Sequence, residues 1–234
     1  EVARKFALAQ SGGVAGGSTI LGTSLRASLP DAIFASAMTG HGAEINDFNP
    51  SAFVQPGPSV VSTALTVAER EHRSGSEVVR AVIAGYELAC RIPKALGVGR
   101  LAAMGISGHA VGPVFGVAAA ASSLLRFDET QIGDVLSYCG QQASGSLQWL
   151  MDVRHIEKSF VFAGMPARNG IHAALFVEAG LTGVPDVVDQ AGSWIQAPMF
   201  TEGELTRPEG RSDATNDYQL DYLTDDLGKR FEMP

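Results

Sequence analysis

The sequence predicts an all-α fold, a multi-helical bundle of closely packed helices. Apolar residues make up 45% of the 234 residues, aromatic residues only 7%, and Ala and Gly are abundant. Small side chains let helices approach closely, and the apolar residues recur at helical spacing without sustained strand alternation. The helical body is expected over residues 1–200.

Local signals place the first helices. Residues 1–10 form a short helix, and 19–23 a short extended piece. Pro30 suits the first turn of a helix over 29–45, and Asp31 complements its dipole. A polar loop interrupts the helical pattern, and Ser59 is the candidate cap of the next helix, 59–73.

The helix over 76–96 has the clearest pattern. Ser76 is its candidate cap, and Pro93 is expected to end or kink it. Its apolar stripe consists of Val79, Val82, Ile83, Tyr86 and Cys90.

The second half continues the helical pattern. A Gly-rich connector over 99–113 leads to a buried helix over 114–127, "VFGVAAAASSLLRF". Asp128 and Gln131 have capping-box spacing at the start of 128–150. Gly180 fits the C-cap of a helix over 165–180, and the acidic stretch 201–234 reads as a polar linker.

Composition limits the possible functions. The formal net charge of −8 argues against a nucleic-acid partner, and an anionic substrate would need a local cluster of cations. Cys90 and Cys139 read as buried free thiols in a reducing, cytoplasmic compartment. No 18-residue membrane span, signal peptide, metal-ligand spacing, phosphate loop or G-x-S-x-G motif is apparent, so no membrane, metal or cofactor is expected.

Two polar concentrations are candidates for a site. The loop "EINDFNPSAFVQPGPSV" carries Asp47, Ser51 and Gln55, and its prolines are expected to stiffen it. The segment 151–170 is basic in an acidic chain, which favours anion binding. Ordinary solvated loops remain the alternative for both. The basic segment carries Arg154, His155, Lys158 and Arg168.

Histidines add a third candidate position. His109, in "SGHAVG", either caps the following buried helix or lies in a cleft. His41 follows the first long helix and is a candidate partner of that helix's C-terminus. His72 is expected at the surface and His172 in the core or at an interface.

The ordered set "HGAEINDF", "SVVSTALTVAE", "VVRAVIAGYELACRI", "VFGVAAAASSLL", "ASGSLQWL" and "GMPARNGIHAALFVEAGLTG" resembles the MmgE/PrpD family. That family includes 2-methylcitrate dehydratase, cis-aconitate decarboxylase and iminodisuccinate epimerase. The resemblance implies a large helical domain that lacks its first helices here, a second α/β domain absent from this chain, and a homodimer. It also implies no iron–sulfur cluster.

The resemblance assigns residues one by one. Asp47 and Ser51 match the D-F-D-D-T/S segment of the family, whereas Gln55 stands where a His-Pro histidine is usual. Ser107 stands at the second family histidine, with His109 two residues on. Lys158 matches the family lysine with one residue inserted, and Phe162 takes the place of the histidine that follows it.

The expected chemistry is proton removal next to a carboxylate of a small di- or tricarboxylate, as a lyase or an epimerase. The catalytic candidates are Asp47, His109 and Lys158. Such a proton is weakly acidic, so the site needs a base and a cation for the developing charge. A diverged, non-catalytic binding or dimerisation protein is the alternative. The substrate-binding candidates are Ser51, Gln55, Ser107, Arg154, His155 and Arg168.

Overall fold

A computed structural model describes residues 1–12, 17–185 and 187 of the chain, and confirms the all-α class. The expected linker over 201–234 lies outside the described residues. The elements are α1 (Val2–Gln10), β1 (Ser18–Thr19), β2 (Arg26–Ala27), α2 (Leu29–His41), α3 (Gly57–Glu71), α4 (Gly75–Leu96), α5 (Val98–Ala103), α6 (Gly108–Leu125), α7 (Glu129–Gln142), the 3-10 helix η1 (Leu147–Met151), α8 (Ile156–Ser159), the π-helix η2 (Phe160–Gly164) and α9 (Met165–Glu178).

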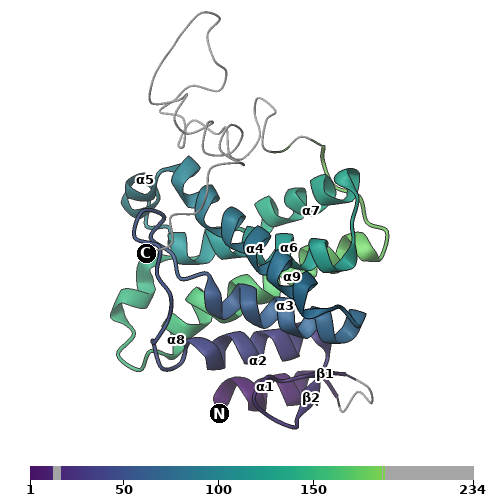
Figure 1. Ribbon diagram of the computed structural model, residues 1–234. Helices are drawn as coiled ribbons and strands as arrows, with labels where there is room; N and C mark the ends of the chain where they lie inside the picture. The colour runs from purple at the N-terminus through teal and green to yellow at the C-terminus, as the bar shows by residue number, and fades with distance from the viewer. Residues whose placement is uncertain (13–16, 186, 188–234) are drawn as a thin grey trace, which may run out of the picture.

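Helix α6 is the centre of the bundle, with α4, α3, α7 and α9 packed around it (Figure 1). Its length and apolar composition would allow it to cross a membrane, which corrects the expectation that no such segment exists. However, 78% of this helix is buried inside the fold, as in the core helix of a soluble protein. The helix contributes to both large core clusters, through Val117 and Leu124 to one and Val111 and Phe115 to the other.

Glycines on α6 allow its close crossing with α4. A Cβ on Gly112 would lie 2.1 Å from the carbonyl oxygen of Ala89, and one on Gly116 would lie 2.5 Å from that of Gly85. The glycines of the stretch 99–113 suggested a connector. That prediction is wrong for the last residues of the stretch, which form the first turns of α6. Pro93 stays inside α4, which continues to Leu96.

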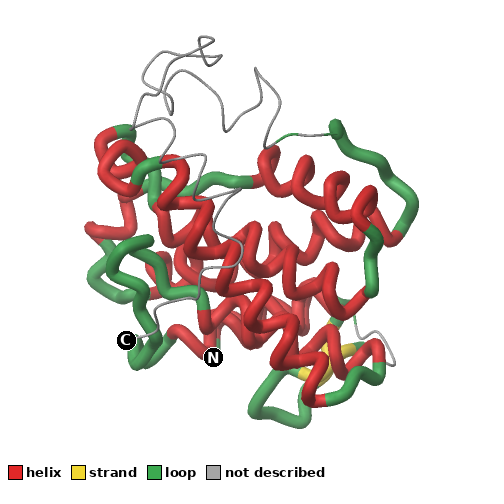
Figure 2. The backbone as a smooth tube through the Cα atoms, turned by 45° about the horizontal axis from the view of Figure 1, so that its top comes forward, coloured by secondary structure: helices red, strands yellow, loops and turns green. Residues whose placement is uncertain are grey.

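The N-terminal elements cover one side of this bundle. Helix α1 packs on α2, and the two antiparallel strands pair as Ser18 with Ala27 and Thr19 with Arg26. Figure 2 shows this small sheet at the edge of the helical body. Ser28 caps α2 by accepting a hydrogen bond from the backbone N–H of Asp31, as expected for a helix start.

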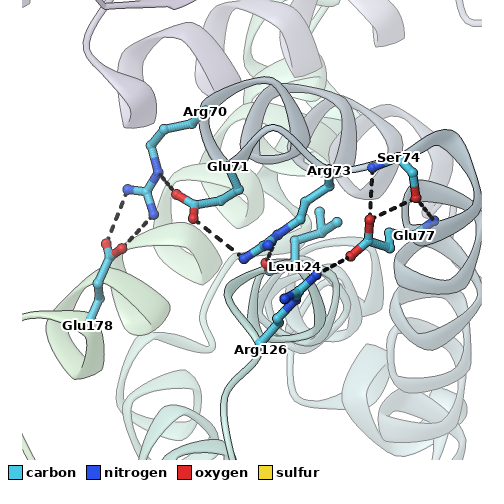
Figure 3. A network of polar contacts seen from close by, with 8 residues as sticks. All are labelled: Arg70, Glu71, Arg73, Ser74, Glu77, Leu124, Arg126 and Glu178. Carbon is cyan, nitrogen blue, oxygen red and sulfur yellow. Dashed lines mark hydrogen bonds and ion pairs between the residues drawn. The ribbon is translucent and has the colours of Figure 1, made fainter.

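Ion pairs fasten the ends of several helices to one another (Figure 3). Arg70 of α3 donates to both carboxylate oxygens of Glu178 on α9, at 3.1 and 2.6 Å. Arg73 donates to the carbonyl oxygen of Leu124 in α6, and Arg126 pairs with Glu77 of α4. This network is at the end of the bundle where α3 meets α4 and α6 meets α7.

Several helix boundaries differ from those expected. Helix α2 ends at His41 rather than at residue 45, and the helix expected over 128–150 ends at Gln142, although its Asp128–Gln131 capping box is confirmed. Ser74, not Ser76, caps α4 and forms a capping box with Glu77.

The prediction that Ser59 caps α3 is wrong. Helix α3 starts two residues earlier, and the Ser59 hydroxyl donates to the carbonyl oxygen of Pro56. Pro58 lies in the first turn, where a missing N–H costs nothing. Pro56 and Pro58 therefore start the helix instead of stiffening the loop.

The apolar stripe predicted on α4 is only partly buried. Cys90 is buried and free, as is Cys139. Val79 and Ile83 are each 59% exposed, so this part of the stripe faces away from the described core. Burial raises the pKa of the Cys90 thiol to about 12, which keeps it protonated.

Candidate functional site

The loop between α2 and α3 and the loop leading into α8 meet at one end of the bundle (Figures 1 and 2). Glu44 of the first loop contacts two residues of the second. One of its carboxylate oxygens pairs with Nδ1 of His155, and the other accepts a hydrogen bond from Nζ of Lys158 at 2.7 Å. Hydrogen bonds from Lys158 and then from His155 lower the pKa of Glu44 to about 2. The two polar concentrations of the sequence thus meet at Glu44, which contacts His155 and Lys158.

Asp47 lies at the N-terminus of α3. Both of its carboxylate oxygens accept from the backbone N–H of Gly57, at 3.1 and 3.2 Å. The Tyr86 hydroxyl also hydrogen-bonds this carboxylate, and burial, with the charge of Asp47, raises the pKa of Tyr86 far above its usual range. Tyr86 therefore stays protonated and donates. Asp47 is exposed, so it is at once a helix cap and a carboxylate open to solvent.

Backbone contacts hold this first loop in shape. Asn49 and Val54 form an isolated antiparallel bridge, and the Asn49 side-chain oxygen accepts from the backbone N–H of Ala52 and from the Ser51 hydroxyl. Ala52 and Val54 are buried against Cys90 of α4. Ser51 is exposed and its hydroxyl stabilises the turn, so its described contact belongs to the loop itself.

His109 lies in an aromatic enclosure in the first turn of α6. Its ring stacks on Phe162, with centroids 3.8 Å apart, and the rings of Phe48, Phe53 and Trp149 complete the enclosure at 5.1–6.4 Å. Burial lowers the pKa of His109 to about 3, so the ring is neutral at pH 7. Its Nδ1 is buried and has no hydrogen-bond partner among the described residues.

Two residues beside this enclosure are among the site residues predicted from the sequence. Ser107 is fully buried, and its hydroxyl accepts a hydrogen bond from the indole N–H of Trp149 at 3.1 Å. Nζ of Lys158 lies 5.6 Å from the centroid of Phe162 and 5.9 Å from that of Trp149. Lys158 therefore connects the ionic part of the site with its aromatic part, since an ammonium is attracted to ring faces at this distance.

Gln55 reaches the site through a second histidine. The Nε2 atom of His41 lies 3.1 Å from the Gln55 side-chain oxygen, and its Nδ1 lies 3.1 Å from the Ser159 hydroxyl. Ser159 also donates to the carbonyl oxygen of His155, so the chain of contacts joins both loops. The His41 ring is fully buried, and burial is the main cause that lowers its pKa. The Phe162 ring lies edge-on to it at 5.2 Å.

The two predicted arginines take no described part in this cluster. Arg154 is exposed, and only its backbone N–H has a described hydrogen bond, to the Asp152 side chain. Arg168, on α9, lies with its guanidinium 5.9 Å from the ring of Phe160. The sequence placed both near the site because they are close to Lys158 along the chain.

Sequence reasoning missed several contributors to the site. The role of His41 was left open between binding and pairing with its own helix end, and the helix was extended through Glu44. The facing charges of Glu44 and of the basic segment were the available signal for their pairing. No sequence signal indicated a site role for Trp149 and Tyr86, since an aromatic residue at helical spacing is ordinarily part of the core. Among the described residues, no group of three or more His, Cys, Asp or Glu side chains is placed to hold a metal ion.

The fold and the site together define an all-helical domain with an ionic and aromatic site between two loops at one end of the bundle. A comparison with known families matches residues 1–206 to the MmgE/PrpD N-terminal domain. The chain therefore belongs to the MmgE/PrpD family, whose members are generally lyases or isomerases. A search of curated proteins finds no match.

Proposed function

We propose that this protein removes a proton next to a carboxylate of a small di- or tricarboxylate, as a lyase or an epimerase. The observation that carries the proposal is that Lys158, on α8, contacts Glu44 of the loop that also carries Asp47, and lies beside a neutral and enclosed imidazole. An ammonium stabilises the negative charge that develops on the substrate carboxylate when the proton leaves. Asp47 is the proposed base, because its carboxylate is exposed and fixed by Gly57.

The neutral state of His109 limits its part in this mechanism. A ring with a pKa of about 3 is unprotonated at pH 7 and cannot supply the proton that a leaving hydroxyl needs. That task falls to His155 in a dehydration. In an epimerisation no hydroxyl leaves, but a proton must still be delivered to the other face of the same carbon, and His155 is the candidate donor there as well.

Proton abstraction can be tested before the product is known. The protein is incubated in D2O with citrate-like, aconitate-like and aminosuccinate-like acids, and deuterium uptake at carbon is followed by NMR. Exchange with at least one acid, lost in Lys158→Ala, is the expected result. Acids that bind without any exchange would contradict the proposal.

The second candidate is a non-catalytic binding or dimerisation protein on the same scaffold. Phe162 stands where the family resemblance has a histidine, and apolar side chains near the site are exposed: Ile45 by 92%, Val153 by 91% and Met151 by 78%. Binding without deuterium exchange would favour this candidate.

We further propose that the chain forms a cytoplasmic homodimer. Val79 and Ile83, one turn apart on α4, expose an apolar strip that a second copy can cover. Light scattering at micromolar concentration tests this, and a monomer would contradict it.

A further inference from the structure

Glu44 occupies the cationic groups that an anionic ligand of this site would use. Its two carboxylate oxygens are divided between His155 and Lys158, as the oxygens of a bound carboxylate would be. The side chain of Lys158 is only 19% exposed, and that of His155 is 53% exposed. An incoming carboxylate therefore meets a lysine that is already neutralised from within the protein.

The Glu44 carboxylate is free to leave this position. Glu44 is an exposed residue whose side chain is 31% exposed, and Ala43 and Ile45 beside it are exposed as well, so the Glu44 side chain borders water. Asp47 differs, because the N–H of Gly57 and the hydroxyl of Tyr86 fix its carboxylate. Of the two loop carboxylates, Glu44 is the exchangeable one.

The backbone on both sides of the contact is strained. Glu44 has φ of 52° and His155 has φ of 58°, in the left-handed region that residues with a Cβ rarely adopt. Such conformations persist where the surrounding contacts hold them, and they are common at ligand clamps and switches. Breaking the pair removes a contact that holds both loops in this conformation.

We propose that Glu44 is an internal ligand of Lys158 that a substrate carboxylate displaces, so that Glu44 sets how tightly an anion must bind before it occupies the site. This rests on the proposed function only in taking a carboxylate as the ligand. Competition from Glu44 weakens the binding of every anion at Lys158 by the same factor. A monocarboxylate, which exchanges one carboxylate for another, then binds too weakly to compete, whereas a di- or tricarboxylate adds further contacts and still binds.

Calorimetry with tricarballylate, a tricarboxylate that lacks a leaving hydroxyl, tests the displacement. Glu44→Gln keeps the size of the side chain and removes its charge. Since an exposed ion pair of this kind contributes modestly, we expect this variant to bind tricarballylate about fivefold more tightly than the unmodified protein. Glu44→Ala should change binding in the same direction, and thermal melting confirms that both variants fold.

Two control variants separate displacement from a general charge effect. Glu129→Gln makes the same change in net charge at an exposed position on α7 and should leave the affinity unchanged. Adding Lys158→Ala to Glu44→Gln should abolish the gain.

Equal or weaker binding by Glu44→Gln, or no binding by any variant, would overturn the inference. The deuterium-exchange assay reports separately on the proposed function. Tighter binding without exchange in any acid would leave the displacement standing and refute the chemistry. Deuterium exchange together with weaker tricarballylate binding by Glu44→Gln would support the proposed chemistry and refute the displacement.

Discussion

Asp47→Asn separates two roles that the structure gives to one carboxylate. Asp47 caps α3 through the N–H of Gly57, and it is the proposed base. The substitution keeps the shape of the side chain and one acceptor oxygen, but it removes the charge and the ability to take a proton. A cap and a base therefore respond differently to the same change.

The effect on stability should be small. Asn and Asp are nearly equivalent as N-cap residues, and the charge at a helix N-terminus contributes about 0.3–1 kcal/mol. A chain of this size loses about 2–4 °C in Tm for each kcal/mol, so Asp47→Asn should lower the Tm by less than about 4 °C. Asp47→Ala also removes the acceptor, and should cost about 0.5–2 kcal/mol.

The effect on turnover should be large. Loss of a positioned base lowers kcat by roughly 10²-fold or more, with little change in substrate binding. Steady-state kinetics on the acid found in the deuterium-exchange panel, alongside thermal melting, gives both quantities. If kcat stays within twofold of the unmodified protein while the Tm falls, Asp47 is a helix cap and the assignment of the base is wrong.

Three further predictions address the binding group, the core and the response to pH. Lys158→Ala should weaken binding of a tricarboxylate by about tenfold or more in calorimetry, because a charged hydrogen bond is lost, and Lys158→Arg should weaken it much less. Gly112→Ala should destabilise the protein by roughly 3 kcal/mol in denaturant unfolding, because the new Cβ would lie 2.1 Å from the carbonyl oxygen of Ala89, whereas Gly99→Ala, with nothing within 4 Å, should be near neutral. The lowered pKa of His109 means that only the unfolded state takes up this proton between pH 6.5 and about 3. Stability should therefore fall by roughly 2 kcal/mol from pH 7 to pH 5, and His109→Phe should remove most of this dependence, so an unchanged pH profile in that variant would contradict the assignment.

Features of the fold that depend on local sequence could be predicted. The capping box of Asp128 and Gln131 involves residues three positions apart, and the buried run in α6 has no charged side to offer to water. The same kind of signal at Ser74 and Glu77 was available, and the nearby Ser76 was chosen in its place. This error shifts the cap of α4 by two residues and leaves the bundle intact.

Features that depend on distant contacts could not be predicted from the sequence. Glycine at position 112 indicates a loop by local propensity, but α4 crosses so closely there, as at Gly116, that a side chain would not fit. The end of α2 had a local signal, because Gly42 follows its last residue as the C-cap. The pairing of Glu44 beyond it with Lys158, 114 positions further along the chain, had none.

The site also shows why matching positions one by one gives an incomplete inventory of its imidazoles. Gln55, Ser107 and Phe162 stand where the family resemblance has histidines, which by position counts as three losses. In the folded chain the ring of His41 contacts Gln55 and Phe162, at 3.1 Å from the Gln55 oxygen and 5.2 Å from the Phe162 centroid. His109 stacks on Phe162 itself, with ring centroids 3.8 Å apart. Helices α2 and α6 thus bring two imidazoles to the places next to the substituted residues, and both are buried with lowered pKa values. Chemistry that needs a neutral imidazole is therefore compatible with this site, whereas His109 cannot supply a protonated one at pH 7.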